Sequence, residues 1–409
     1  EPERRPGRFG SFLLPAEGCR PSRGRLQAGG RKKETTMDIA KNDDILEKSG
    51  YLLLDRATLI ENYRKLQRHV GPEVTLIPVV KGNCYGYGAE EITDVLVNDC
   101  RVRVIGVGAL CEGTAMRRRG VACDLMLLGG IAPQQYHIAL HNDIIISIFR
   151  PECALAYEEL CAAEGRVGRI QIKIETGMNR LGFRPEAIPQ VLFRLNNIPK
   201  VEVVDLLAHF ANAEVTYGQD KPVTVQNQLA ALIQLRGLLP MCLSNTGGIL
   251  WHEAGDEAVR AGIAMYGVSP DGNVSSQSLG IDPVMTLESE IIAFQDLQPG
   301  EACGYGSKFI AHRPTKLAVV ACGYADGYPR KDNPHREVVV EGKRVPVIGN
   351  VSMDMLTIDV TDLPNVRLGS KVEIWGKNLP VNEVAKGFGT IGYELLCDVN
   401  QRVPRVLIK

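Results

Sequence analysis

Short apolar runs alternate with amphipathic segments through the first two thirds of the chain. Between about residues 50 and 285, eight runs have the character of buried strands, at 74–80, 102–108, 125–130, 144–149, 170–174, 203–208, 241–244 and 262–268. The segments between them, such as 151–165 and 223–239, place apolar residues at helical spacing. Because near-continuous apolar strands followed by helices are typical of a covered parallel sheet, the pattern predicts an α/β fold. Eight such units match a (β/α)8 barrel, and an open doubly wound sheet is the alternative.

The pattern changes after Pro283. Helical spacing nearly disappears, and short alternating runs such as "REVVVEG" and "LTIDVTD" stand between Gly, Pro and Asp residues. We therefore predict a barrel domain at residues 47–285 and a C-terminal all-β domain at residues 286–409. Residues 1–46 stand apart, because the first 36 are rich in Arg, Pro and Gly and lack periodicity. We predict an added leader there; an Arg-rich transit peptide is the alternative, against which four glutamates argue.

The composition excludes several classes of function. With 409 residues the chain is long enough for two domains, and its net charge of −1 gives no case for nucleic acid or an acidic membrane surface. No apolar run is long enough to span a membrane. The 11 cysteines include no C-x-x-C pair and no His/Cys group with zinc spacing. We therefore predict no metal site, and reduced thiols in a cytoplasmic protein.

The first candidate for chemistry is a lysine at the end of the first apolar run. In "VTLIPVVKGNCYGYG", Lys81 follows the strand directly and precedes glycines at 82, 86 and 88. The carboxyl ends of barrel strands face the active site, where a partly desolvated lysine can form a Schiff base with an aldehyde cofactor. The glycines would allow close approach of a ligand. A solvated lysine at a strand end is the alternative.

Other polar residues follow other strands in the same way. They are Lys173, Glu175 and Arg180 at the end of the fifth strand, His209 at the end of the sixth, Asn245 and Thr246 after the seventh, and Arg260 beside the eighth. Each alone has a structural explanation, as an ion-pair, core or turn residue. Together at one rim they predict a site, and the donors of "SNTGG" and "RAGI" suit a phosphate group. The barrel segment contains no P-loop and no G-x-G-x-x-G, which makes a nucleotide site a weak interpretation.

With these residues in view, the chain resembles the alanine racemase family, the fold-type III pyridoxal-phosphate (PLP) enzymes. The resemblance covers about residues 47 to 409 and rests on motifs in family order: "PVVKGNCYGYG", "TGMNRLGF", "AHFANAE", "SNTGG", "VRAGIAMYG", "GYGSKF", "CGYADGYPR", "GNVSMDM" and "YELLCDVNQRVPR". It implies that the protein interconverts L- and D-alanine with PLP. A racemase for serine or for a broader range of amino acids is the alternative within the family.

The resemblance also implies how PLP would be held. Lys81 would carry it as an internal aldimine, and Arg260 would face its pyridine nitrogen. Tyr85, Tyr393, Thr246 and the amides of Gly262 and Ile263 would bind its phosphate, with His209 and Asn245 completing the cofactor site. A guanidinium does not accept a proton, so the pyridine ring beside it stays neutral and delocalises the negative charge of the substrate Cα less strongly. Reprotonation at Cα is then favoured over transamination. A fold-type III decarboxylase would place a carboxylate there, and a PLP-carrier protein would lack the second domain.

Two bases would serve the two faces of the substrate. The resemblance implies Lys81 for one face and Tyr305, from the β domain of the other subunit of a homodimer, for the other. Tyr324, Met353 and Asp354 would also act across the dimer. The substrate carboxylate would be held by Arg180 and the backbone of Met353. Lys173 stands where the family carries a carbamylated lysine, and an ordinary salt-bridged lysine is the alternative.

The sequence departs from the family pattern at several positions. Gly247 and Gly248 stand where two alanines are common, and Thr246 replaces a serine. The hydroxyl group is kept at Thr246, so phosphate binding is not threatened. We expect the two extra glycines to loosen the pocket, which puts strict specificity for alanine in doubt. Gly82, Cys84, Tyr87 and Asn350 are further departures from common residues.

Overall fold

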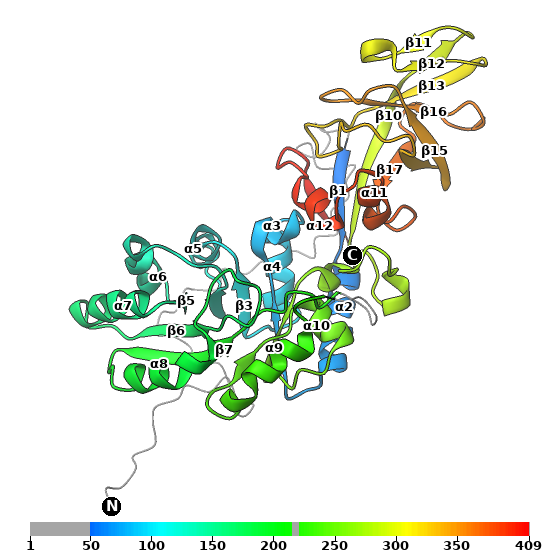
Figure 1. Ribbon diagram of the computed structural model, residues 1–409. Coiled ribbons are helices and arrows are strands. Elements are labelled where there is room, and N and C mark those ends of the chain that lie inside the picture. The colour runs from blue at the N-terminus through cyan, green and yellow to red at the C-terminus, as the bar shows by residue number, and fades with distance from the viewer. Residues whose placement is uncertain (1–49, 215–220, 409) are drawn as a thin grey trace, which may run out of the picture.

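Eight parallel strands form a closed barrel in the computed structural model, which describes residues 50–214 and 221–408 (Figure 1). The strands are β2 (Thr75–Pro78), β3 (Val104–Val107), β4 (Asp124–Leu127), β5 (Ile144–Ile148), β6 (Gly168–Lys173), β7 (Val201–Leu207), β8 (Met241–Cys242) and β9 (Ala258–Ala261). They pair in chain order from β3 to β9, and β2 pairs with β9. A parallel bridge between Val79 and Gly106 joins the two ends. The sheet therefore closes, which confirms the barrel and excludes the open doubly wound alternative. The predicted leader lies outside the described residues.

The eighth strand lies earlier in the chain than predicted. It is Ala258–Ala261, whereas the predicted run at 262–268 contains the 3-10 helix η5 (Ile263–Tyr266). All four residues of η5 are fully buried, and periodicity alone does not separate a buried strand from a buried helical turn. Gly267, with φ of 79°, ends the turn in the left-handed region. The shift places Arg260 inside a strand rather than beside one.

Helices cover the outer face of the barrel (Figure 1). They are α2 (Arg56–Val70), α4 (Ala89–Asn98), α5 (Leu110–Arg118), α6 (Tyr136–His141), α7 (Pro151–Ala163), α8 (Ile188–Leu195), α9 (Val225–Leu232) and α10 (Thr246–Trp251), with short 3-10 turns η2 (Pro133–Gln135), η3 (Pro185–Ala187) and η4 (Ile233–Leu235). Helices α2 and α9 begin at residues whose side chains cap them. Asp55 accepts from Thr58 N at 2.8 Å, and Thr224 accepts from Asn227 N at 3.1 Å.

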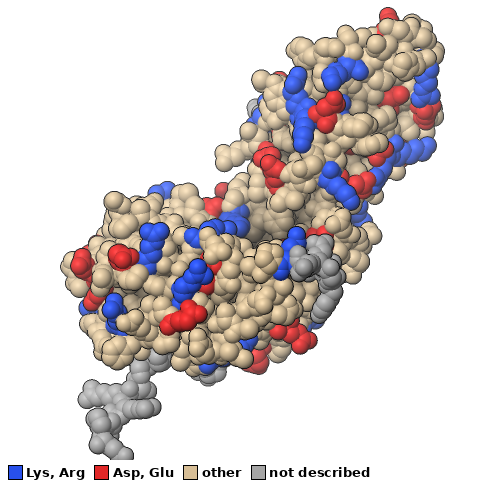
Figure 2. Space-filling model, in the orientation of Figure 1, with Lys and Arg blue, Asp and Glu red and all other residues tan. Residues whose placement is uncertain are grey.

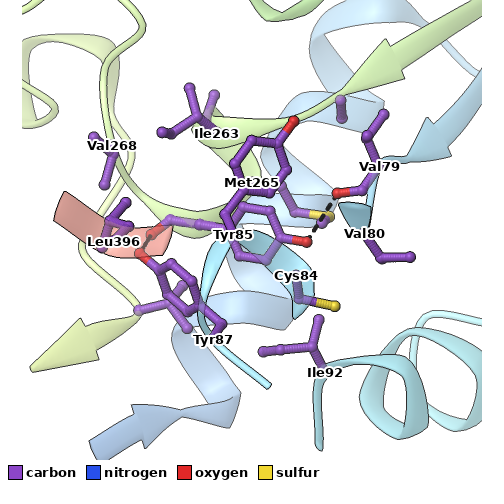
Figure 3. Close-up of a cluster of buried hydrophobic side chains, with 14 of the residues drawn as sticks. Val79, Val80, Cys84, Tyr85, Tyr87, Ile92, Ile263, Met265, Val268 and Leu396 are labelled. Atoms are coloured by element: carbon purple, nitrogen blue, oxygen red, sulfur yellow. Dashed lines mark hydrogen bonds between the residues drawn. The ribbon is translucent and has the colours of Figure 1, made fainter. Parts of the chain in front are cut away.

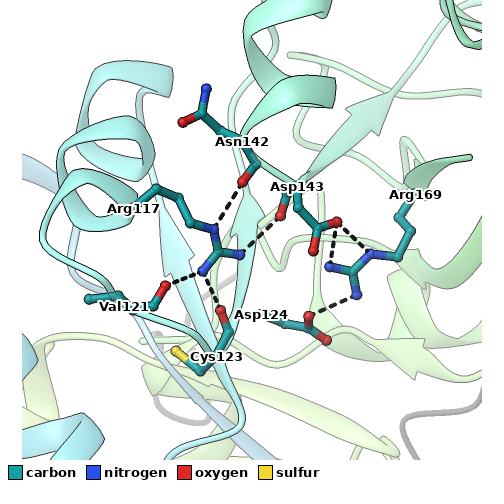
Figure 4. A network of polar contacts seen from close by, with 7 residues as sticks. All are labelled: Arg117, Val121, Cys123, Asp124, Asn142, Asp143 and Arg169. Atoms are coloured by element: carbon teal, nitrogen blue, oxygen red, sulfur yellow. Dashed lines mark hydrogen bonds and ion pairs between the residues drawn. The ribbon is translucent and has the colours of Figure 1, made fainter. Parts of the chain in front are cut away.

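Two arginines hold the strands together at the amino ends of β4 to β6 (Figure 4). Arg117 donates to four backbone carbonyls on the loops before β4 and β5, those of Val121, Cys123, Asn142 and Asp143. Arg169 bridges the carboxylates of Asp124 at 2.8 Å and Asp143 at 3.0 Å. Arg117 and Arg169 thus tie together the loops and strand ends on the side away from the predicted site.

A second sheet of eight strands forms the C-terminal domain. Its strands are β10 (Met285–Leu297), β13 (Thr315–Val320), β14 (Glu337–Val340), β15 (Lys343–Ile348), β16 (Leu356–Asp359), β17 (Lys371–Trp375), β18 (Arg405–Ile408) and β1 (Gly50–Asp55), beside a small hairpin of β11 (Ala302–Cys303) and β12 (Phe309–Ile310). Strand β1 pairs antiparallel with β10 and parallel with β18. The first strand of the segment assigned to the barrel therefore belongs to the second sheet.

The C-terminal domain also contains helices, which an all-β prediction leaves out. These are α11 (Val381–Gly387), α12 (Gly392–Cys397) and the turn η7 (Tyr305–Ser307); η6 (Gln277–Leu279) lies in the connection to this domain. Figure 1 places α12 beside α3 (Lys81–Tyr85), at the junction with the barrel. Figure 2 shows two lobes with a hollow between them and charges of both signs intermixed on this face. No helix among the described residues is long and apolar enough to span a membrane.

Candidate active site

A cavity of about 770 Å³ opens at the carboxyl ends of the barrel strands. The barrel residues predicted for the site line it together, along with one residue of α12: Lys81, Tyr85, Lys173, Arg180, His209, Asn245, Thr246, Arg260, Gly262, Ile263 and Tyr393. Four predicted residues of the second domain are not among the lining residues in this chain: Tyr305, Tyr324, Met353 and Asp354. The predicted site is thus divided between one cavity and a separate surface.

The backbone after Lys81 forms a left-handed turn. Gly82, Asn83 and Cys84 have φ of 62°, 53° and 55°, with ψ near those of a left-handed helix. For residues with a side chain this conformation costs roughly 1–2 kcal/mol each. The turn is held by packing, since Cys84, Tyr85 and Tyr87 are buried in an apolar cluster with Ile92, Met265 and Leu396 (Figure 3). This packing therefore holds the strained turn that directly follows Lys81.

A carboxylate that the sequence analysis missed holds this turn in place. Glu112, in the first turn of α5, accepts hydrogen bonds from Gly82 N at 2.6 Å, Gly108 N at 2.8 Å and Ala109 N at 3.0 Å. It thereby joins the loop after β3 to the residue after Lys81. The local signal was an acid three residues after a helix start, the position that caps a helix N-terminus.

Gly86 lets the backbone of α12 approach closely and does not make room for a ligand. Its φ is 84°, and a Cβ built on it would lie 1.8 Å from Leu396 O in α12. The expectation that the glycines after Lys81 admit a ligand is therefore wrong for Gly86. The close approach brings α12 against the turn, and this carries Tyr393 to a position where its ring is 6.0 Å from that of Tyr85.

The cavity contains a small space bounded by hydroxyl groups that fits a phosphate. Thr246 Oγ1 accepts from Gly262 N at 3.0 Å, and Asn245 caps α10 by accepting from Gly248 N at 3.0 Å. A Cβ on Gly262 would lie 2.8 Å from Tyr85 Oη and 3.3 Å from Thr246 Oγ1, so only glycine leaves this space open. Burial raises the pKa of Tyr85 and of Tyr393. Both phenols thus stay protonated and can donate to an anion.

Arg260 lies at the floor of the cavity and is only 4% exposed. Nη1 donates to Cys242 O at 2.7 Å, and Nη2 donates to Ala208 O at 2.8 Å and Leu243 O at 3.0 Å. Nη2 also lies 3.1 Å from His209 Nδ1. Because a guanidinium only donates, Nδ1 accepts and the ring proton is on Nε2. Burial and then the charge of Arg260 lower the pKa of His209 well below its ordinary value, which keeps this tautomer neutral. Within the described chain the bonds of Arg260 use its terminal nitrogens, and Nε remains for a ligand.

Two lysines in the cavity have lowered pKa values. Burial, followed by the charges of Arg180 and Arg260, lowers the pKa of Lys81. Burial and the same two arginines lower the pKa of Lys173 to about 8, and its Nζ donates to Leu128 O at 3.1 Å. Glu175 orients the loop that carries Arg180 by accepting from Arg180 N at 3.0 Å. The cavity thus combines a strongly cationic wall with amines that are easily deprotonated, which suits nucleophilic chemistry on an anionic ligand.

The two extra glycines do not widen the pocket. A Cβ on Gly247 would lie 2.9 Å from Ala213, and a Cβ on Gly248 would lie 2.8 Å from Ser244 Cβ. Neither glycine lines the cavity. The expectation of a loosened pocket is therefore wrong. These glycines instead let α10 pack closely against the neighbouring barrel residues Ala213 and Ser244.

The predicted residues of the second domain lie on an exposed surface. Tyr305 is 71% exposed, and Tyr324 and Met353 are also exposed. Asp354 forms an ion pair of 2.8 Å with Arg402 Nη2. Asn350 Nδ2 donates to Tyr305 O at 2.7 Å and so fixes the backbone of η7. Within the described chain these side chains thus lie on the surface and not in the cavity.

The sequence and the fold are similar to those of known proteins. The family model "Alanine racemase, N-terminal domain" matches residues 54–270, and "Alanine racemase, C-terminal domain" matches residues 284–407. The chain is 38% identical over 354 residues to an alanine racemase of Ralstonia pickettii, covering 85% of this chain and 92% of that protein. The biosynthetic alanine racemase of Pseudomonas aeruginosa has a similar structure, with a TM-score of 0.80 and 35% identity, covering 88% of this chain and 100% of that one. The alanine racemase of Streptomyces coelicolor gives a TM-score of 0.82 at 26% identity, with 90% and 99% covered.

Proposed function

Because the chain belongs to the alanine racemase family, we propose that it interconverts L- and D-alanine and uses PLP as its cofactor. One observation carries the proposal: Lys81, which follows a strand end, and the buried Arg260 line the same cavity. A carboxylate in place of Arg260 would have favoured a decarboxylase. The second lobe argues against a carrier protein, which would be a single barrel.

The groups that line the cavity would each have a role in holding PLP. Lys81 would bind the aldehyde carbon, and Arg260 would face the pyridine nitrogen. The phosphate would lie between Tyr85, Thr246, Tyr393 and the open space at Gly262, with the amide of Ile263 beside it. When bound, PLP withdraws electrons from the substrate Cα and makes its proton acidic. The cationic wall favours both the phosphate and the substrate carboxylate, the latter held by Arg180.

We assign the two proton transfers to groups from different lobes. Once the substrate amine has displaced it from the cofactor, the freed Lys81 amine would remove or return the α-proton on one face of the substrate. The other face needs a second base, for which Tyr305 is the candidate. Its place outside the cavity of its own chain, on an exposed surface, supports a homodimer in which each subunit completes the site of the other. Tyr324, Met353 and Asp354 would join that composite site.

A cytoplasmic location stays a prediction from the cysteine usage.

A racemisation assay with single L-amino acids tests the proposal. We expect D-alanine to form from L-alanine, with serine turned over more slowly, as measured by chiral chromatography. Lys81→Ala should abolish the reaction and the yellow colour of the protein. Lys65→Ala should change neither, because Lys65 is a half-buried lysine of α2 that pairs with Asp282 at 3.5 Å, outside the cavity. Faster turnover of serine than of alanine would favour the broader racemase, and no D-isomer from any amino acid would refute the proposal.

A further inference from the structure

A buried carboxyl group lies in the barrel interior and has no part in the proposed reaction. Asp205 in β7 is 0% exposed, and neither of its oxygens has a hydrogen-bond partner within the described chain. Its register partner on β6 is Gln171, which is also fully buried. Leu207, two residues further along β7, lines the cavity. Since alternate residues of a strand share a face, Asp205 lies on the same inner face, one layer below the site.

The amide of Gln171 has a fixed orientation. Its Nε2 donates to Leu127 O at 2.9 Å and to Ser147 Oγ at 2.9 Å. Ser147 Oγ in turn donates to Leu127 O at 2.8 Å, so a flipped amide would set its oxygen against two acceptors. Its Oε1 is buried and without a partner in the described chain. Gln171 therefore needs a donor on the side where β7 runs.

The charged groups around Asp205 have other partners. On β9, Arg260 uses its terminal nitrogens on backbone carbonyls and lies 3.1 Å from Cys242 Sγ of β8 through Nη1. On β6, Arg169 pairs with two aspartates at the amino end, and Lys173 donates to Leu128 O. No ion pair to Asp205 occurs among the described residues. A carboxylate would thus be buried without the pairing that its charge requires.

We propose that Asp205 is a neutral carboxylic acid that donates to Gln171 Oε1 and that its protonation tunes the positive charge of Arg260 toward the cofactor site. The neutral form supplies the donor that Gln171 lacks and removes the cost of a buried charge. In the ionised form, the Asp205 carboxylate and Gln171 Oε1 would face each other as two acceptors without a donor. Its negative charge would also offset the positive charge of Arg260. Burial raises the pKa of Asp205 to about 7, although Arg260 acts in the opposite direction. The tuning role rests on the proposed function; the hydrogen bond does not.

Infrared spectroscopy of the full chain tests the hydrogen bond. We expect the carbonyl stretch of a protonated carboxyl group below pH 7, its loss as the pH rises through about 7, and its absence in Asp205→Asn. Gln171→Met should move the band to higher frequency, because the acid loses its acceptor. Asp282→Asn, an exposed aspartate, should leave the band unchanged. A spectrum of Asp205→Asn equal to that of the wild type, or no shift in Gln171→Met, would overturn the proposal.

Binding of PLP to the cofactor-free protein tests the tuning role. The ratio of the wild-type Kd to that of Asp205→Asn should rise about fivefold through pH 7, since the ionised form weakens the cationic site. The ratio cancels the titration of PLP itself and of Lys81. A ratio that does not change with pH overturns the tuning role while racemisation continues. A chain that binds no PLP overturns the proposed function and the tuning role together, and the infrared result on Asp205 still stands.

Discussion

Burial and two neighbouring arginines bring the pKa of the Lys173 amine close to neutrality. At pH 8 about half of these amines are neutral, because the pKa is about 8, and the neutral fraction falls tenfold per unit below that. Carbamylation needs the neutral amine. With ¹³C-labelled bicarbonate we expect a carbamate signal at about pH 9 that fades toward about pH 6 and is absent in Lys173→Met. Lys65→Met should keep the signal. If no pH gives a signal, Lys173 acts as a plain amine.

The second prediction at this scale concerns Tyr305. Tyr305→Phe keeps the ring and removes the oxygen that would carry the proton, so racemisation should fall by ~10²–10⁴ in both directions. In deuterated water, α-proton exchange should persist for D-alanine through Lys81 and nearly stop for L-alanine. Tyr63→Phe, at a half-buried tyrosine of α2, should leave both exchange rates as they are. Equal exchange of the two isomers in Tyr305→Phe would show that Tyr305 is not the second base.

The left-handed turn α3 makes a prediction at the scale of elements. Gly82 and Gly86 both have positive φ, but a Cβ on Gly82 would meet only Cys397 Sγ at 3.6 Å, whereas one on Gly86 would overlap Leu396 O at 1.8 Å. Gly82→Ala should therefore cost about 1 kcal/mol of unfolding free energy. Gly86→Ala should cost roughly 3 kcal/mol or more, since the backbone of α12 must move. Urea denaturation measures both. Equal losses would mean that α12 does not rely on this contact.

Glu112 belongs to the same scale, because it joins two loops to one turn. Glu112→Gln keeps the size of the side chain but can accept fewer hydrogen bonds from the three amides. Lys81 should then be less well oriented, and the Kd for PLP should rise about tenfold with little loss of thermal stability. Glu61→Gln, an exposed glutamate that pairs with Arg68, is the matched control. An unchanged Kd would mean that Glu112 is only a helix cap.

At the scale of the whole molecule, the separation of Tyr305 from the cavity predicts activity shared between subunits. Lys81→Ala and Tyr305→Phe should each be inactive alone. After subunit exchange in an equal mixture, half of the dimers are mixed and each has one intact site, so about a quarter of wild-type activity should return. Light scattering verifies that the protein is a dimer, and differently labelled subunits verify the exchange. Exchanged mixtures as inactive as their parents would place the complete site within one chain.

Local pattern determined much of the fold. The alternation of apolar runs and helices predicted the barrel, and the change of texture after Pro283 predicted the second domain, since both depend on short-range periodicity. The pairing of β1 with β10 and β18 was not predictable in this way, because those partners are more than two hundred residues away. The eighth strand was misplaced because a fully buried run has no polar face to reveal its period.

The site likewise has features that follow from local sequence and features that depend on contacts between distant segments. The sequence alone determined that Lys81 and Arg260 lie in or directly after strands whose carboxyl ends meet. The motifs shared with the family indicated the other residues of the site. Only the tertiary structure decided that Glu112 holds the turn after Lys81 and that Gly86 admits α12. It also decided that Asp205 faces Gln171 within the barrel. Each of these contacts joins separate elements, and their partners become neighbours only when the barrel closes and the second lobe packs against it.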